Sequence, residues 1–468
     1  MDTPESRHNP HPTDSKLIDW TRYPLLPLFI PFLFGIGGGY LCTVEWGWMP
    51  PPKWLVVNAG VCICLNIIYN RLLSRQPDKY KPHIFYILTA LTFFLFGLIL
   101  SCRSHRQALE RYGEEWKYEI YKNNDWQNER AAELQRWLHE RFTAVPAEKD
   151  GFCWQNHPDE CAVVEAMTTG WRRGLTKEIK QTYRMAGISH VLALSGYHVG
   201  LIFLALLWVF KMFGGSIAWR RAGYVLILFI LWGYALVTGM SPSIVRATLM
   251  CSVVTLLKLL ERDAELMNVC IVAAFLMLAA NPLLIGHVGF QLSFCSVAGI
   301  ALMGRWIPWS YFLGGLMVSF VCTVATGPLV AYHFGAVPVY GLLTNVYASL
   351  LVPPILVLTA VWWLLVAVGW VVGVWILPLA GGVAMALCRV AWLLNKIAEG
   401  VSGLPFATVE TRLSVVEVVG WYGVILAAVS LCYRVTGRRI IVLQVLLIGT
   451  LFSTVARKMG LGFGLFGE

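Results

Sequence analysis

Long apolar stretches, separated by short polar or charged connections, run through most of the chain. The stretches are continuous rather than alternating, and most are about 20 residues long, the length of a helix that crosses a bilayer. This pattern argues against a transmembrane β-barrel. The candidate spans are 24–44, 54–70, 83–101, 191–210, 222–239, 244–260, 266–285, 288–304, 311–331, 354–373, 376–395, 414–433 and 440–456. We predict an all-α polytopic integral membrane protein with about 12–14 transmembrane or half-membrane helices.

One shorter apolar piece, 336–350, does not fit this series. Pro338 opens it and Pro353-Pro354 closes it. The basic residues of 434–439 belong on the cytoplasmic side only if this piece adds no full crossing. We therefore predict a re-entrant or half-length helix here.

The polar segment 102–185 carries charges of both signs. Within it, Glu129–Phe142 has an amphipathic pattern typical of a helix, which would lie on the membrane surface or serve as a solvated connector. The predicted divisions are a cytoplasmic tail 1–22, a three-span region 23–101, an extracytoplasmic segment 102–185, a channel-type membrane domain 186–456 and a tail 457–468.

Composition and charge agree with a membrane location. Hydrophobic residues make up 57% of the chain and charged residues 14%, against roughly 45–50% and about 25% in soluble domains. The net charge of +10 suggests nucleic acid, but cytoplasmic loops of membrane proteins collect Lys and Arg in any case. The basic loop 71–82 predicts a cytoplasmic N-terminus and a multi-pass protein of the inner membrane. The polar first twenty residues do not resemble a secretory signal peptide.

The cysteines mostly stand singly in apolar stretches, where they behave as small hydrophobic residues. No spacing resembles a zinc site, and we expect no metal and no cofactor. Cys153 and Cys161 flank a polar run. If that run faces an oxidising compartment, we expect them to form a disulfide.

The most informative polar residues interrupt the apolar stretch 187–200, which reads GISHVLALSGYHVG. His190 and His198 are eight positions apart, so on a continuous helix they would lie roughly 80° apart around the axis. Both could border one wide cavity, and Ser195-Gly196 favours a break or a close helix contact. Packing is the plainer explanation for a single Ser or Gly, but two histidines in one span favour function.

A second polar group begins at Ser241-Pro242, a combination typical of a helix start. Arg246 follows just inside the predicted span. It either faces water within the protein or extends along the membrane to the nearby interface.

Two further motifs lie downstream. Gln291 and Ser293 follow Asn281-Pro282, and Asn345 follows the run His333-Phe-Gly335. Each alone is explained by helix packing. Together, several short segments interrupted by Gly or Pro indicate a binding or transit site built from broken helices.

These four motifs, in this order, resemble the central domain of the competence DNA-uptake channel family (ComEC), closely over roughly 160–350. The resemblance implies a channel that passes one DNA strand across the cytoplasmic membrane during natural transformation. It also implies an external DNA receptor, a cytoplasmic motor and a separate nuclease as partners, besides single-stranded DNA and the lipid bilayer. The channel-lining candidates that it implies are His190, Ser195, Gly196, His198, Arg246, Gln291, Ser293 and Asn345.

The sequence departs from the family at several places. Tyr197 stands where Leu is usual, His287 where Asp is common, and Trp171 replaces a frequent acidic residue. The outer segment is too short for an oligonucleotide-binding β domain. No metal motif of a metallo-β-lactamase-like nuclease is present. We therefore expect a reduced member of the family that is not an enzyme.

Two other functions remain open. The same fold could carry a small anionic solute, since fold does not fix function. An intramembrane hydrolase with Ser195 as nucleophile and a histidine as base is the third reading, although no third orienting group is evident.

Overall fold

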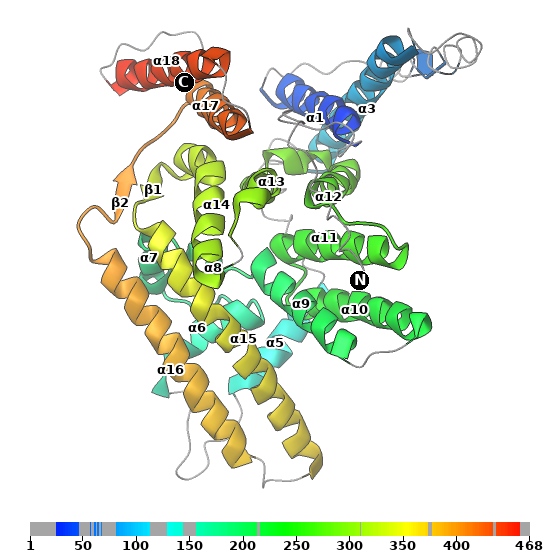
Figure 1. Cartoon of the computed structure of the whole chain (residues 1–468). Coiled ribbons are helices and arrows are strands. Elements are labelled where there is room, and N and C mark those ends of the chain that lie inside the picture. The colour runs from blue at the N-terminus through cyan, green and yellow to red at the C-terminus, as the bar shows by residue number, and fades with distance from the viewer. Residues whose placement is uncertain are drawn as a thin grey trace, which may run out of the picture.

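The computed structural model describes residues 25–45, 81–112, 129–143, 156–212, 216–308, 310–372, 377–433 and 437–458, with scattered positions between 57 and 67. These residues form helices and their connections, with one small two-stranded sheet (Figure 1). The predicted all-α class is therefore confirmed. The first helices are α1 (Leu26–Tyr40), continued by the π-helical turn η1 (Leu41–Glu45), α3 (Lys81–Tyr112), α5 (Glu129–Thr143), α6 (Pro158–Thr168), α7 (Lys177–Met185) and α8 (Ser189–Leu192).

The remaining elements form the larger part of the molecule. They are α9 (Gly196–Met212), α10 (Ile217–Val237), α11 (Pro242–Leu259), α12 (Leu266–Ala280), η4 (Pro282–Gly286), α13 (Val288–Met303), η5 (Gly304–Trp306), α14 (Tyr311–Phe334), β1 (Ala336–Pro338), α15 (Gly341–Val372), α16 (Leu377–Ser402), β2 (Thr408–Glu410), α17 (Val415–Tyr433) and α18 (Gly437–Lys458).

Seven segments among the described residues are long and apolar enough to cross a membrane, by length and composition. They are Leu26–Val44, Trp219–Val237, Pro242–Leu259, Leu313–Phe334, Gly341–Gly369, Pro378–Ser402 and Val415–Cys432. Four shorter apolar helices accompany them: Gly196–Met212, Leu266–Ala280, Val288–Met303 and Val442–Leu451. The protein is thus a polytopic membrane protein, as predicted. Most of the predicted span 54–70 lies outside the described residues.

Small residues let α1 and α3 approach each other closely. A Cβ atom added to Gly35 would overlap the carbonyl oxygen of Phe94, and one added to Gly97 would overlap that of Phe32. Gly39, one turn after Gly35, faces Ser101 in the same way. Such contacts between small residues hold membrane helices together by close backbone packing.

The predicted half-length helix at 336–350 was wrong. Instead, α15 runs without interruption from Gly341 to Val372, with Pro353 and Pro354 inside it. Proline within a helix leaves the carbonyl four residues earlier without its donor. For Pro353 that carbonyl belongs to Ser349, and it accepts a hydrogen bond of 3.2 Å from the hydroxyl of Tyr197 in α9. A polar group from a neighbouring helix thus allows the proline within α15.

The small sheet joins two connections between helices. β1 lies between α14 and α15, and β2 lies between α16 and α17. β1 pairs antiparallel with β2, so that Val337 lies opposite Val409. Gly335 ends α14 in the left-handed conformation, at φ 65°, where glycine is favoured. The turn between α14 and α15 is therefore fixed by a glycine cap and a strand contact.

The largest hydrophobic cluster joins α6, α7 and α8 to α15 and α16. Cys161–Thr168 of α6 are all buried, and the Tyr183 hydroxyl of α7 donates to Asn395 Oδ1 of α16 at 2.6 Å. The predicted amphipathic helix is confirmed as α5. It docks through Gln135, whose Nε2 donates to Thr169 O at 2.9 Å.

Candidate channel site

The helix break predicted at Ser195-Gly196 is present. The short helix α8 ends at Leu192, Ala193 is extended, and α9 begins at Gly196 near the centre of the view in Figure 1. Two atoms of Ser195 contact the Nδ1 atom of His198: its backbone nitrogen at 3.1 Å and its Oγ at 2.8 Å. The break therefore brings Ser195 and His198 together as one local unit.

This contact determines the tautomer of His198. A backbone N–H can only donate, so Nδ1 must accept and the ring proton lies on Nε2. His198 is 1% exposed, and its Nε2 has no hydrogen-bond partner within the described part of the chain. A buried donor without a partner costs free energy unless water or a ligand satisfies it.

His190 has a different environment. The residue is exposed. Ser189, Gly196 and Tyr197 are also exposed, so α8 and the first turn of α9 present an accessible surface.

Arg246 lies in the second turn of α11. The predicted helix start at Ser241-Pro242 is confirmed, although Ser241 makes no side-chain cap. Arg246 is only 5% exposed, and its Nε has no hydrogen-bond partner among the described residues. The side chain is therefore enclosed by protein, which argues against extension to the membrane interface. Its Nη2 lies beside Gly289, 3.6 Å from where a Cβ would stand.

The third and fourth motifs meet directly. Gln291 Oε1 of α13 accepts a hydrogen bond of 2.8 Å from His333 Nε2 of α14, and Gln291 Nε2 donates to Ile285 O at 2.8 Å. Ser293 is half-buried, and its carbonyl accepts from Ser296 Oγ at 2.9 Å. Asn345 lies in the second turn of α15, where its buried Oδ1 has no partner in the described structure.

The early turns of four helices come together at this place. A Cβ on Gly196, the first residue of α9, would lie 3.4 Å from Ala247 of α11. Arg246 of α11 reaches Gly289, the second residue of α13. Tyr197 of α9 bonds to Ser349 of α15. Helix N-termini carry partial positive charge and free N–H groups, so the starts of α9 and α13 at this junction favour anions.

The sequence analysis named two further contributors to this arrangement without predicting their contacts. Tyr197 was noted as a departure from the family pattern, although Pro353, four residues after Ser349, signals a carbonyl in need of a donor. His333 pairs with Gln291 across 42 positions, which no local signal could indicate.

The hydrolase reading finds partial support in the geometry. Ser195 Oγ lies within hydrogen-bond reach of His198 Nδ1, as a nucleophile and base would. However, Nδ1 also accepts from the Ser195 backbone. Within the described residues Nε2 lacks the carboxylate that would orient the ring. Among the described residues the catalytic arrangement is therefore incomplete.

The predicted disulfide stays a prediction. Cys161 is a buried, free thiol of α6, whereas Cys153 lies outside the described residues.

Comparison with known proteins identifies relatives of this region. A family model described as "Competence protein" matches residues 167–436. ComE operon protein 3 of Bacillus subtilis (strain 168) is 29% identical over 205 residues, which cover 42% of this chain and 26% of that protein. An uncharacterized protein of Aquifex aeolicus (strain VF5) is 32% identical over 180 residues, 38% of this chain and 42% of the relative. The chain thus spans less than half the length of these curated relatives. No solved structure matches.

Proposed function

Because the chain belongs to the competence protein family, we propose that it acts in DNA uptake as a channel that passes a single DNA strand across the cytoplasmic membrane. The observation that carries the proposal is the buried Arg246 beside the starts of α9 and α13. Arginine stays protonated and forms forked bonds with phosphate oxygens. The partial positive charges of the helix starts act in the same direction.

In the proposed channel, the described conformation corresponds to a closed state. His198 and Arg246 are 1% and 5% exposed, so neither lines an open aqueous route. Opening requires separation of α9 from α11 at the contact between Gly196 and Ala247. The break before α9 is the proposed hinge, because Ala193 is extended between α8 and α9.

Opening would also satisfy the buried polar atoms. His198 Nε2–H and Arg246 Nε–H are donors without partners in the described residues. Phosphate oxygens of a passing strand would accept from both. The exposed aromatic ring of Tyr197 adds a face on which a base could stack. The free-energy cost of the unpaired donors in the closed state thus favours occupancy by an anion.

The experiment replaces Arg246 in a transformable host and counts transformants. We expect Arg246→Leu to lower uptake on the order of 10- to 100-fold, which corresponds to the loss of a charge-assisted hydrogen bond. Arg246→Lys should retain part of the activity because the charge remains. Arg220→Leu, at an exposed position of α10, is the matched control and should transform normally. Membrane insertion of each variant is measured by fractionation. Normal transformation by Arg246→Leu would refute the proposed role.

The tight closed packing also favours a second candidate, a transporter of a small anionic solute. A solute carrier needs only a narrow site at the midplane, and the buried Arg246 would suit a single anionic group. Purified protein in vesicles discriminates the two. A channel for DNA admits a single-stranded oligonucleotide, whereas a solute carrier admits inorganic phosphate and excludes the oligonucleotide.

The proposed setting follows from the family and the charge pattern. The N-terminus and the 71–82 loop lie in the cytoplasm, residues 102–185 lie outside, and the protein resides in the inner membrane. Its partners are an external DNA receptor, a cytoplasmic motor and a separate nuclease. Pull-down of the inserted protein with each partner tests this assembly.

A further inference from the structure

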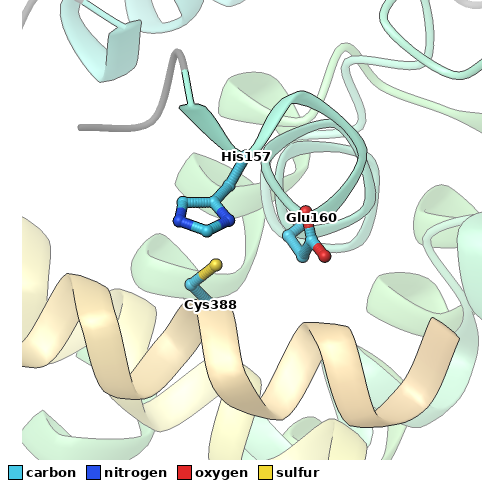
Figure 2. A group of neighbouring side chains, drawn as sticks. All are labelled: His157, Glu160 and Cys388. Carbon is cyan, nitrogen blue, oxygen red and sulfur yellow. The ribbon is translucent and has the colours of Figure 1, made fainter. Parts of the chain in front are cut away.

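Three side chains of metal-binding type converge where α6 packs against α16. His157, Glu160 and Cys388 each offer one ligand atom, and these atoms all lie within 4.8 Å of one another. Figure 2 shows the Cys388 thiol pointing toward the His157 imidazole, with the Glu160 carboxylate alongside. This cluster lies in a different part of the molecule from the helix junction around Arg246.

The start of α6 places two of the three groups. His157 is the N-cap residue, Pro158 occupies the first turn, and the His157 carbonyl accepts from the Cys161 backbone at 3.0 Å. Residues three apart on a helix are neighbours on one face, so Glu160 stands next to His157. The third group, Cys388, lies within α16 and is buried.

The combination of donors suits a borderline-soft divalent cation. Zinc binds imidazole nitrogen, thiolate sulfur and carboxylate oxygen at about 2.0–2.3 Å. Donor atoms around such an ion stand roughly 3.3–3.8 Å apart, so the three side chains need only small rotations to close on it. Mg²⁺ and Ca²⁺ prefer all-oxygen sites, and the thiol disfavours them.

We propose that His157, Glu160 and Cys388 form a binding site for a zinc-class divalent cation that joins α6 to α16. On binding, Cys388 releases its thiol proton to solvent and its sulfur forms a bond to the metal. Thiolate and carboxylate together then balance the two positive charges of the ion, and the imidazole stays neutral. His157 is exposed, so the ion enters from its side, and the fourth coordination position stays open there.

The site has a structural consequence. It links α6, in the segment that precedes the helix break, to the long helix α16. These two helices are far apart in the sequence. An ion that binds only the folded protein stabilises it according to its concentration and affinity. Metal binding would therefore hold α6 against the membrane domain. This role is independent of whether the protein passes DNA.

The test uses the full chain, purified in detergent without a histidine tag and with its thiols reduced. Cobalt(II) serves as a spectroscopic probe for zinc. We expect one cobalt ion to bind per chain and to give a thiolate-to-cobalt charge-transfer absorption. This absorption should disappear when zinc displaces the cobalt. His157→Ala and Cys388→Ser should weaken zinc binding by more than about 100-fold, beyond the roughly 10- to 100-fold that the loss of an outer-shell partner costs. Cys388→Ser should also abolish the charge-transfer absorption.

Cys161→Ser is the matched control, because Cys161 is a neighbouring buried thiol in the same hydrophobic cluster. It should bind cobalt as the wild type does. His157→Ala guards against loss of fold, since His157 is exposed, and size-exclusion profiles check both cysteine variants. The proposal fails if the wild type binds no stoichiometric cobalt. It also fails if folded His157→Ala binds zinc as tightly as the wild type, or if Cys161→Ser and not Cys388→Ser removes the absorption.

Discussion

The Tyr197 hydroxyl donates a 3.2 Å hydrogen bond to the Ser349 carbonyl, the group that Pro353 leaves without its helical donor. The bond joins the first turn of α9, beside the helix break, to the third turn of α15. It thereby connects the polar motif 187–200 with α15. The sequence patterns had divided this helix incorrectly, into a half-length piece and a separate span. Tyr197 thus has a structural role.

Removal of this hydroxyl should destabilise the protein modestly. We expect Tyr197→Phe to lower the free energy of unfolding by about 1 kcal/mol, the net value of one hydrogen bond. Denaturant or thermal unfolding in detergent measures the difference. Tyr347→Phe, at an exposed position of the same helix α15, serves as control and should change little. Equal effects of the two substitutions would contradict the assignment.

Gly187 should tolerate no side chain. Its φ of +79° lies in the left-handed region, and a Cβ would stand 2.7 Å from the Gly341 Cα. Both the backbone strain and the contact with another backbone oppose substitution. We expect Gly187→Ala to destabilise by about 2 kcal/mol or more.

Gly200, in the same motif, provides the comparison. It is helical, with open space around a Cβ, so Gly200→Ala should be neutral or stabilising by up to about 1 kcal/mol. Thermal stability of the two purified variants decides the point. If Gly187→Ala is as stable as Gly200→Ala, the turn before α8 is not fixed as described.

The buried carboxyl of Glu165 predicts a pH dependence outside the membrane spans. Burial raises the pKa of Glu165 above its ordinary value of 4.5, and the contact with His139 Nδ1 at 2.8 Å opposes part of that rise. A carboxyl with a raised folded pKa favours the protonated form. Its ionisation therefore costs stability, which falls as pH rises from 4.5 through the folded pKa.

Glu165→Gln tests this sign. The amide imitates the protonated carboxyl, so the variant should be more stable than the wild type at neutral pH, and the difference should vanish on acidification. Melting temperatures of both proteins across this pH range provide the measurement. Glu133→Gln, at an exposed position of α5, should show no such trend. A variant less stable than the wild type at neutral pH would show that the bond with His139 outweighs the cost of burial.

The membrane orientation is open to labelling. Single cysteines introduced at Asp125 and Pro77, in a background without reactive native cysteines, should react differently with an impermeant reagent added from outside. Because the basic 71–82 loop should be cytoplasmic, we expect label at position 125 and none at position 77. Labelling of position 77 alone would invert the orientation.

The sequence by itself determined the features that depend on local chemistry. Hydropathy indicated the membrane helices. The pair Ser195-Gly196 indicated the break between α8 and α9, and Ser241-Pro242 marked the start of α11. Each of these outcomes depends on burial within lipid or on the backbone preferences of a few adjacent residues. Such information is contained in a short stretch of neighbouring residues.

Only the tertiary structure decided the features that depend on distant partners. Tyr197 keeps α15 continuous past Pro353 by serving a carbonyl 152 positions away. Protein packing encloses Arg246 although its place in α11 also suited extension to the interface. Cys388 joins His157 and Glu160 only because α6 docks on α16. A hydrogen bond, a burial or a ligand set depends on which surfaces meet, and the sequence around one residue does not contain the surface that will cover it.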